Sequence, residues 1–128
     1  MQNLTFFSIQ QLSNAIDTKE LDPIVLARFY LDRIESVGRS LNCYIAVSKE
    51  AALAQAGPSS TGAQQRRSLG SLDGVPIALN DSIYVARSSV GFGGIHTAVT
   101  EDAKVVRRLC ATAAVWSNFG LVLDPSAI

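Results

Sequence analysis

The sequence predicts an α/β fold in which a helical N-terminal part is followed by short strands and a flanking helix. Three observations predict it: apolar residues recur at helical spacing before residue 57, a continuous apolar run begins at Val75, and a second helix-then-strand pattern follows residue 100. Helix and strand following an earlier buried strand form a βαβ arrangement, which builds a parallel or mixed sheet with helices on its faces.

The first helix is predicted directly after Ser8. Ser8 and Gln11 have the Ser-x-x-Gln form of a capping box, and Ile9, Leu12 and Ile16 then recur on one helical face. We therefore expect a short amphipathic helix here.

The second helix is predicted to begin after Asp22. Asp22 offers a side-chain oxygen to the unpaired amides of the first turn, and Pro23 has a preset dihedral for the first helical position. Gly38 is expected to end the helix. Its apolar face is predicted to contain Leu26, Tyr30, Ile34 and Val37.

Two further segments complete the N-terminal part. Residues 41–47 are rich in β-forming residues and predict a strand or extended segment, and Ser48 is expected to cap a third helix over Lys49–Ala56. Residues 57–71 are rich in Gly, Pro, Ser, Thr, Gln and Arg, without apolar periodicity, which predicts a solvated loop.

The C-terminal part is predicted to supply the sheet. Val75–Leu79 is typical of a buried strand, with Pro76 either at its start or at an unpaired position, because proline has no amide hydrogen. A second short strand is expected at 83–85 and a turn at Gly91–Gly94.

A last helix and strand follow that turn. Thr100 is expected to cap a helix with Glu101 and Asp102 at its positive end and Arg107 and Arg108 at its negative end. Val106 and Leu109 share one face of it, beside Ala103 and Cys110, and residues 113–116 predict the next strand.

Composition excludes several functions. Hydrophobic residues make up 48% of the chain, which excludes intrinsic disorder, and 11 basic residues balance 11 acidic ones without a basic block, which argues against nucleic-acid binding. The sequence contains no apolar run of about 18 residues that could span a membrane. Its first residues also lack the basic and then apolar pattern of a secretory signal, so we expect a cytoplasmic protein. Neither Cys43 nor Cys110 has a second Cys or His at the spacing of a metal site. We therefore expect both cysteines to lie in the core, and we expect the protein to need no metal or cofactor.

One segment resembles a known family. Residues 70–83, GSLDGVPIALNDSI, resemble the amidase-signature pattern G-x-L-x-G-[IV]-P-[IV]-x-[LIV]-K-D-x-[IF], and residues 102–109 resemble the D-A-x-V-V-x-R-L that follows it. The resemblance extends over about residues 5–115. It implies a single partial amidase domain over 1–128, with a helical part (1–56), a loop (57–71), a sheet and helix portion (72–116) and a divergent tail (117–128).

The resemblance implies hydrolysis of carboxamide bonds of small amides by a serine, a cis-serine and a lysine, within a central mixed sheet between helices. Asn80 occupies the lysine position, next to Asp81. A side-chain amide has no lone pair basic enough to take a proton from the bridging serine, so Asn80 cannot inherit that role. Gly93 matches the glycine of a family Gly-Ser pair, with Gly94 in place of the serine.

The sequence after Val115 also departs from the family. It does not continue into the G-K-T-N-like segment and the glycine-serine stretch that carries the two serines. Ala113 and Arg87 stand where the family has glycines. We therefore expect no intact catalytic residue in this chain, a pseudoenzyme, and hypothesise a truncated or degenerate gene product with a tail from an altered reading frame or splice choice.

Other interpretations of single residues are simpler. Asp81 is expected to satisfy backbone amides, and Gly91–Gly94 to form a turn rather than a phosphate cradle. His96 could form a triad with Ser88 or Ser89 and Asp102, but we expect an exposed loop histidine. Trp116 is expected in the core or in an exposed apolar patch.

Two other functional classes remain open. The chain could be a non-catalytic binding module that docks, through exposed apolar surface, on a full-length amidase or its partner. Alternatively it does not fold stably, because the strands at 75–79 and 113–116 would present sheet edges without neighbours.

Overall fold

The structure, a computed structural model, describes residues 3–42, 44, 47, 49–79, 83, 89–92, 95–98, 100–112 and 114–117, the strands within 89–98 and 115–117 by their backbone only. Its elements are the 3-10 turn η1 (Leu4–Phe6), helices α1 (Ile9–Asp17), α2 (Pro23–Arg33), α3 (Arg39–Leu41), α4 (Lys49–Gln64) and α5 (Lys104–Ala111), the π-helical turn η2 (Ile34–Gly38), and strands β1 (Pro76–Ala78), β2 (Ser89–Phe92), β3 (Ile95–Ala98) and β4 (Val115–Ser117).

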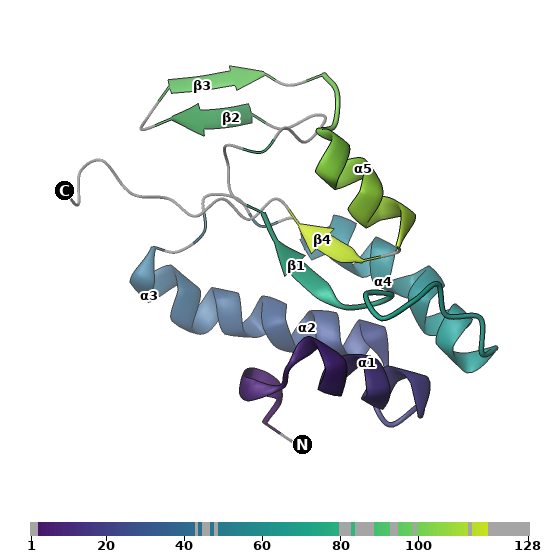
Figure 1. The fold of residues 1–128 in the computed structure, drawn as a ribbon. Coiled ribbons are helices and arrows are strands. Elements are labelled where there is room, and N and C mark those ends of the chain that lie inside the picture. Colours follow the sequence, from purple (N-terminus) through teal and green to yellow (C-terminus); the bar gives the residue numbers. More distant parts are fainter. Residues whose placement is uncertain are drawn as a thin grey trace.

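The helices and strands form an α/β arrangement, as the sequence predicts. Helix α2 packs against α4, and both contact the pair β1–β4, which α5 approaches from the opposite side in Figure 1. The hairpin β2–β3 is a separate two-stranded sheet. Among the described residues the apolar core forms three clusters, centred on Leu26 and Val75, on Ala27 and Ala56, and on Leu79 and Val106.

Helix α1 begins at the predicted capping box. The Ser8 hydroxyl accepts a hydrogen bond from the Gln11 amide at 3.2 Å, and the Gln11 side chain accepts one from the Ser8 amide at 2.8 Å. Leu12 and Ile16 are buried as predicted. Ile9 is exposed, which was not predicted.

Asp22 begins α2 and also connects it to α4. One carboxylate oxygen accepts from the Ile24 amide at 2.7 Å, and the other accepts from the Ser60 hydroxyl, also at 2.7 Å. Pro23 occupies the start of the helix, as predicted. The single carboxylate therefore caps one helix and fixes the position of a second.

The prediction that Gly38 ends the second helix is wrong. The chain continues through η2 and α3 to Leu41, and Asn42 ends it in the left-handed conformation, with φ 50°. Gly38 is buried, and a Cβ there would lie 3.2 Å from Cδ2 of Tyr44. The glycine thus allows close packing of Tyr44 rather than a left-handed cap. Of the predicted apolar face, Leu26 is buried but Val37 is exposed.

The strand predicted at 41–47 is not observed in the described residues. Leu41 is helical, Asn42 is the cap, and Tyr44 and Val47 lie outside regular structure. Cys43, Ile45, Ala46 and the predicted cap Ser48 lie outside the described residues.

Helix α4 is longer than predicted. It continues from Ala56 to Gln64, through Pro58, so the first half of the predicted loop 57–71 is helical. Ser59 and Ser60 are buried, and the Ser60 hydroxyl donates a hydrogen bond to Asp22 at the start of α2. These tertiary contacts override the low helix propensity of Gly57, Pro58 and their neighbours.

Strands β1 and β4 confirm a strand at the predicted place and the βαβ order. The prediction of a buried strand is only partly right, because Pro76 and Ile77 are half-buried and Ala78 is exposed. The flanking residues Val75 and Leu79 are buried.

The two strands pair in parallel, Pro76 opposite Val115 and Ala78 opposite Ser117, and Pro76 is the first residue of its strand. The last strand begins two residues later than predicted and ends one residue later, over Val115–Ser117. Ala113 is outside the described residues, and nothing is described of the Trp116 side chain.

The turn predicted at Gly91–Gly94 is partly wrong, because Gly91 and Phe92 belong to strand β2. That strand pairs antiparallel with β3, and Gly91 lies opposite His96. His96 is therefore a strand residue and not a loop residue. Gly93 and Gly94 lie outside the described residues, as do Tyr84, Val85 and Arg87, while Ile83 lies in a bend.

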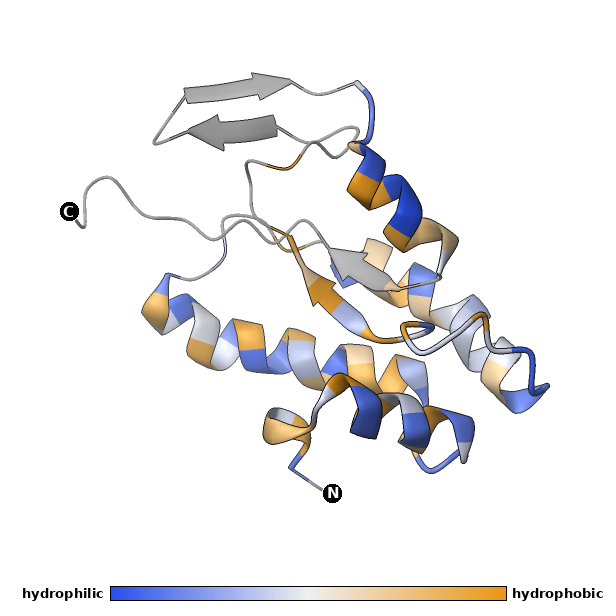
Figure 2. Ribbon diagram, viewed as in Figure 1, coloured by the Kyte–Doolittle hydropathy of each residue, from blue (hydrophilic) through white to orange (hydrophobic). Residues whose placement is uncertain are grey.

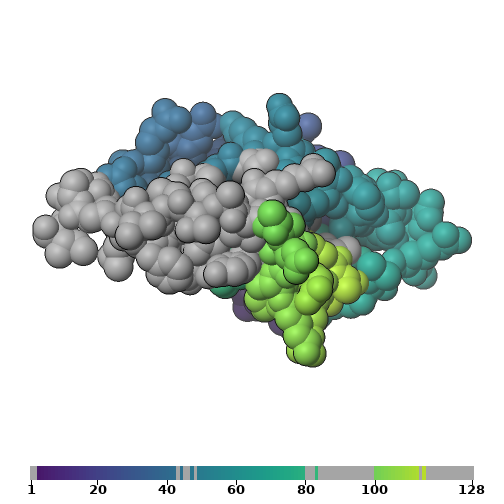
Figure 3. Space-filling view, turned by 90° about the horizontal axis from the view of Figure 1, so that it is seen from above, coloured from purple at the N-terminus to yellow at the C-terminus, as the bar shows by residue number. Residues whose placement is uncertain are grey.

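Helix α5 begins at Lys104 rather than after Thr100. Ala103 precedes the helix in extended conformation, and no side chain caps the first turn. Ala103 packs against the cluster of Leu79 and Val106, and the helix begins at the next residue. Val106 is buried as predicted, but Cys110 is exposed, which contradicts a core position. Hydrophilic residues alternate with apolar ones along α5 (Figure 2), and the helix stands out from the surface seen from above (Figure 3).

Candidate functional site

Strand β1 leads directly to the position that the sequence assigns to catalysis. Leu79 follows the strand, is 7% exposed, and packs with Val106 at the inner face of α5. Asn80 and Asp81 come next in sequence and lie outside the described residues, as does Gly93. The carboxyl end of a parallel strand is the usual place for a ligand in an α/β fold, so the described framework is consistent with a site there.

A tight loop fixes the entry to β1. Gly74 has φ +78°, and a Cβ there would lie 2.8 Å from Cγ of Pro23. The buried carboxylate of Asp73 accepts a hydrogen bond from the Leu69 amide at 2.9 Å. Among the described residues, no donor reaches its other oxygen, Oδ1. The loop therefore holds β1 against the start of α2.

The hypothetical triad is not assembled by the hairpin register. Ser89 lies opposite Ala98, whereas His96 lies opposite Gly91, so these two residues are not paired across the strands. Asp102 belongs to the segment before α5, and Ser88 lies outside the described residues. Within the described part of the chain, no group of three His, Cys, Asp or Glu residues could hold a metal ion. None of the described helices is long and apolar enough to cross a membrane.

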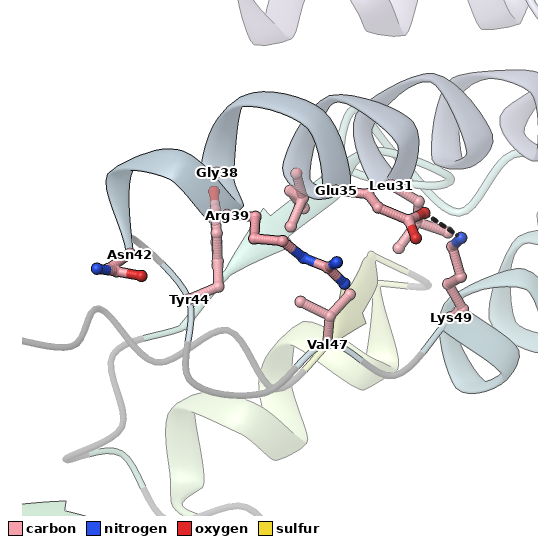
Figure 4. Close-up of a pocket in the computed structure, with 9 residues that line it drawn as sticks. Leu31, Glu35, Gly38, Arg39, Asn42, Tyr44, Val47 and Lys49 are labelled. Atoms are coloured by element: carbon pink, nitrogen blue, oxygen red, sulfur yellow. Dashed lines mark hydrogen bonds and ion pairs between the residues drawn. The ribbon is translucent and has the colours of Figure 1, made fainter.

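A cavity of about 340 Å³ lies between the end of α2 and the start of α4 (Figure 4). Glu35 from η2 and Lys49 from α4 form an ion pair across its rim, with Nζ and Oε2 2.6 Å apart and both side chains about half exposed. The sequence analysis did not find this cavity, because its lining residues share no motif. They are Leu31, Ile34, Glu35, Gly38, Arg39, Asn42, Tyr44, Val47 and Lys49.

The ion pair shifts the pKa values of both Glu35 and Lys49. The hydrogen bond from Lys49, and then its charge, lowers the pKa of the Glu35 carboxyl, and the same contact raises the pKa of the Lys49 ammonium. Because the pKa of Glu35 is lowered in the folded state, the pair stabilises the fold at pH values above the ordinary Glu pKa, and this stabilisation is lost as the pH falls through the folded-state pKa. Because the pKa of Lys49 is raised, its stabilisation is present below the ordinary Lys pKa and is lost as the pH rises through the folded-state pKa of Lys49.

Lys49→Gln is expected to raise the acid titration midpoint of Glu35 toward its ordinary value, because the positive charge is removed and the charged donor is replaced by a neutral amide on a shorter side chain. The midpoint is read from the side-chain carboxyl ¹³C shift. Lys104→Gln, which changes an exposed lysine on α5, is the control and leaves the midpoint in place. An unchanged Glu35 midpoint in Lys49→Gln would show that the pair does not form in solution.

Comparison with known proteins gives consistent matches. The Amidase family model matches residues 25–117. The chain is 38% identical over 115 residues to a glutamyl-tRNA(Gln) amidotransferase subunit from Cupriavidus metallidurans, covering 84% of this chain and 22% of that protein. It is 41% identical over 96 residues to the putative amidase AmiB2 of Mycobacterium bovis, covering 71% of this chain and 20% of that protein.

The fold has solved counterparts as well. The native peptide amidase from Stenotrophomonas maltophilia matches with a TM-score of 0.82 and 27% identity, over 91% of this chain and 25% of that one. The chain thus spans about a fifth to a quarter of the length of the proteins it matches.

Proposed function

This chain belongs to the amidase family, and from that premise we propose that it forms the N-terminal portion of the amidase fold without hydrolysing amides by itself. The family substrate class, a small carboxamide, is carried over as part of the proposal. The observation that carries it is Asn80 in the lysine position of a 14-residue segment that otherwise follows the family pattern.

The chemistry supports this proposal in two steps. Loss of one general base lowers a rate by roughly 10²- to 10⁴-fold, because the serine is then deprotonated only by weaker bases. In addition, the glycine-serine stretch that carries the family's two serines does not occur among these 128 residues. Without that stretch, the chain tested alone has neither the nucleophile nor the amides of an oxyanion hole.

The purified chain is expected to release no ammonia above the blank from a panel of aliphatic and aryl carboxamides. Asn80→Lys is expected to be equally silent, because restoring the base does not supply a nucleophile. A full-length family amidase is the positive control, and the same enzyme with its matching lysine changed to asparagine should lose roughly 10²- to 10⁴-fold in turnover.

Each measurement in this experiment has a result that would contradict part of the proposal. Turnover by the unmodified chain would overturn the proposal and require a nucleophile elsewhere. Turnover by Asn80→Lys alone would show that only the base is missing. Full activity in the lysine-to-asparagine enzyme would remove the significance of Asn80.

A second candidate function is a non-catalytic module that docks on a full-length amidase or its partner. Exposed apolar side chains favour it: Phe6 is 87% exposed and Ile9 54%. Val25, which is 45% exposed, is among the residues that line a hollow of about 790 Å³ beside α1. Saturable binding of the chain to a full-length amidase is the test. Phe6→Ser should weaken binding, and Leu69→Ser, at a residue 66% exposed in the loop before β1, should not.

The cytoplasmic location also belongs to this proposal. Its support is the low cysteine content, two in 128 residues, since small secreted domains of this size commonly rely on several disulfides.

A further inference from the structure

The cavity at the end of α2 has the size of a ligand site. Its volume of about 340 Å³ lies at the lower end of the range of small-molecule pockets, which is roughly 300–1,000 Å³. Leu31, Ile34, Tyr44 and Val47 give it apolar walls, and a few polar groups converge at its rim. The polar residues of the lining are Glu35, Arg39, Asn42 and Lys49, so the cavity offers charged groups beside its apolar wall. Pockets for small organic ligands combine such apolar walls with polar groups that fix the orientation of the ligand.

The backbone around the cavity is held in an unusual shape. The turn η2, Ile34–Gly38, is π-helical, and π-helical turns in proteins occur frequently at functional sites. Gly38 allows the ring of Tyr44 to approach the turn, since a Cβ there would meet Cδ2 at 3.2 Å. The π-helical turn and the packed ring together form one wall of the cavity (Figure 4).

The two cationic residues of the lining, Lys49 and Arg39, differ in whether they form an ion pair. Lys49 is committed to Glu35 in the 2.6 Å ion pair. Arg39 points across the cavity in Figure 4, and in the part of the chain that the structure describes its guanidinium forms no ion pair. Besides the hydrogen bond and charge of Lys49, which contribute more, the charge of Arg39 also lowers the pKa of the Glu35 carboxyl. With two cations and one carboxylate, the lining has a formal charge of +1. A guanidinium presents a planar fork of donors that matches a carboxylate, so Arg39 is suited to bind an anion.

We propose that this cavity binds a small organic carboxylate, whose carboxylate group is held by Arg39 and whose apolar body lies against Tyr44, Val47 and Leu31. The proposal goes beyond the proposed function, because all residues of this site lie between positions 31 and 49 and none comes from the segment around Asn80. Its success or failure is therefore independent of amide hydrolysis.

The test is a ¹⁵N amide-shift titration of the full chain with benzoate as the probe. Benzamide, its neutral isostere, and benzylammonium, a cation of similar size, are the controls. Saturable shifts are expected at Arg39, Tyr44 and Val47 with benzoate. Benzamide should bind at least about tenfold more weakly, because it lacks the charge that pairs with the guanidinium.

Matched variants assign the effect to the guanidinium. Arg39→Ala should weaken benzoate at least about tenfold, and Arg39→Lys by less, because lysine keeps the charge but loses the fork. Arg33→Ala, at an exposed arginine of α2 outside the lining, should leave binding unchanged. The absence of saturable shifts, shifts confined to other residues, equal affinity for benzamide, or unchanged binding in Arg39→Ala would each overturn the proposal.

Discussion

Gly74→Ala is expected to lower the free energy of unfolding by about 2–4 kcal/mol. Two costs add at this residue. Its φ of +78° lies in the region that side chains with a Cβ rarely adopt, and the new methyl carbon would lie 2.8 Å from Cγ and 2.9 Å from Cβ of Pro23. Because Pro23 is buried at the start of α2, neither side can move away easily. Urea denaturation of both chains measures the difference.

Gly62→Ala is the matched control for this prediction. Gly62 lies inside α4, and a Cβ there would come no closer than 3.4 Å to its nearest neighbour outside the helix, the Arg67 carbonyl oxygen. Alanine costs less conformational entropy than glycine in a helix, so this variant should gain about 0.5–1 kcal/mol. Equal stability of the two variants would contradict the loop geometry before β1.

Leu26→Ala is expected to cost about 2–5 kcal/mol of stability. Leu26 is fully buried, and it packs with Leu12, Ile16 and Val75, so its truncation opens a cavity between α1, α2 and the residue before β1. Both the lost burial and the unfilled space contribute to the cost. Denaturant midpoints with unchanged slopes give the value.

Val25→Ala, one residue earlier on the same helix, separates core packing from helix propensity. Val25 is 45% exposed, and the change should stay within about 0.5 kcal/mol. A loss in Leu26→Ala no larger than in Val25→Ala would show that the helices do not pack on β1 as described.

Signals that act over a few residues predicted the structure well. The Ser8 capping box, the Asp22 cap with Pro23, and the strand that begins at Pro76 are all observed. In the two caps the determining hydrogen bond joins residues at most three apart, so the sequence contains it. Pro76 indicates the start of the strand because it has no amide hydrogen. The parallel pairing of β1 with β4 was predictable because short helix-then-strand units have few arrangements available.

Elements that depend on distant contacts were missed. The second half of α4 contains Pro58 and Gly62 and is helical where Ser59 and Ser60 are buried and Ser60 bonds to Asp22 of the neighbouring helix. Gly38 has the residue type of a helix cap, but it serves the packing of Tyr44. Neither fact can be found by periodicity, since each depends on a residue brought near by the fold.

The candidate site was predicted by motif alone. Asn80, Asp81 and Gly93 follow from the match of residues 70–83 and the hairpin region to a family pattern, and they remain predictions because they lie outside the described residues. The reverse holds for the cavity at Arg39. Its residues come from α2, η2, α3 and the segment up to Lys49, and only the folded chain brings them together.

The most direct test is labelling of the chain by a serine-reactive fluorophosphonate, read by intact-mass spectrometry, because it detects an activated nucleophile whatever the substrate. A full-length family amidase treated in parallel should gain one adduct. The 128-residue chain should keep its unmodified mass, as expected of a protein that has Asn80 in the lysine position and no glycine-serine stretch. A stoichiometric adduct on the chain would contradict this and, by peptide mapping, identify the nucleophile.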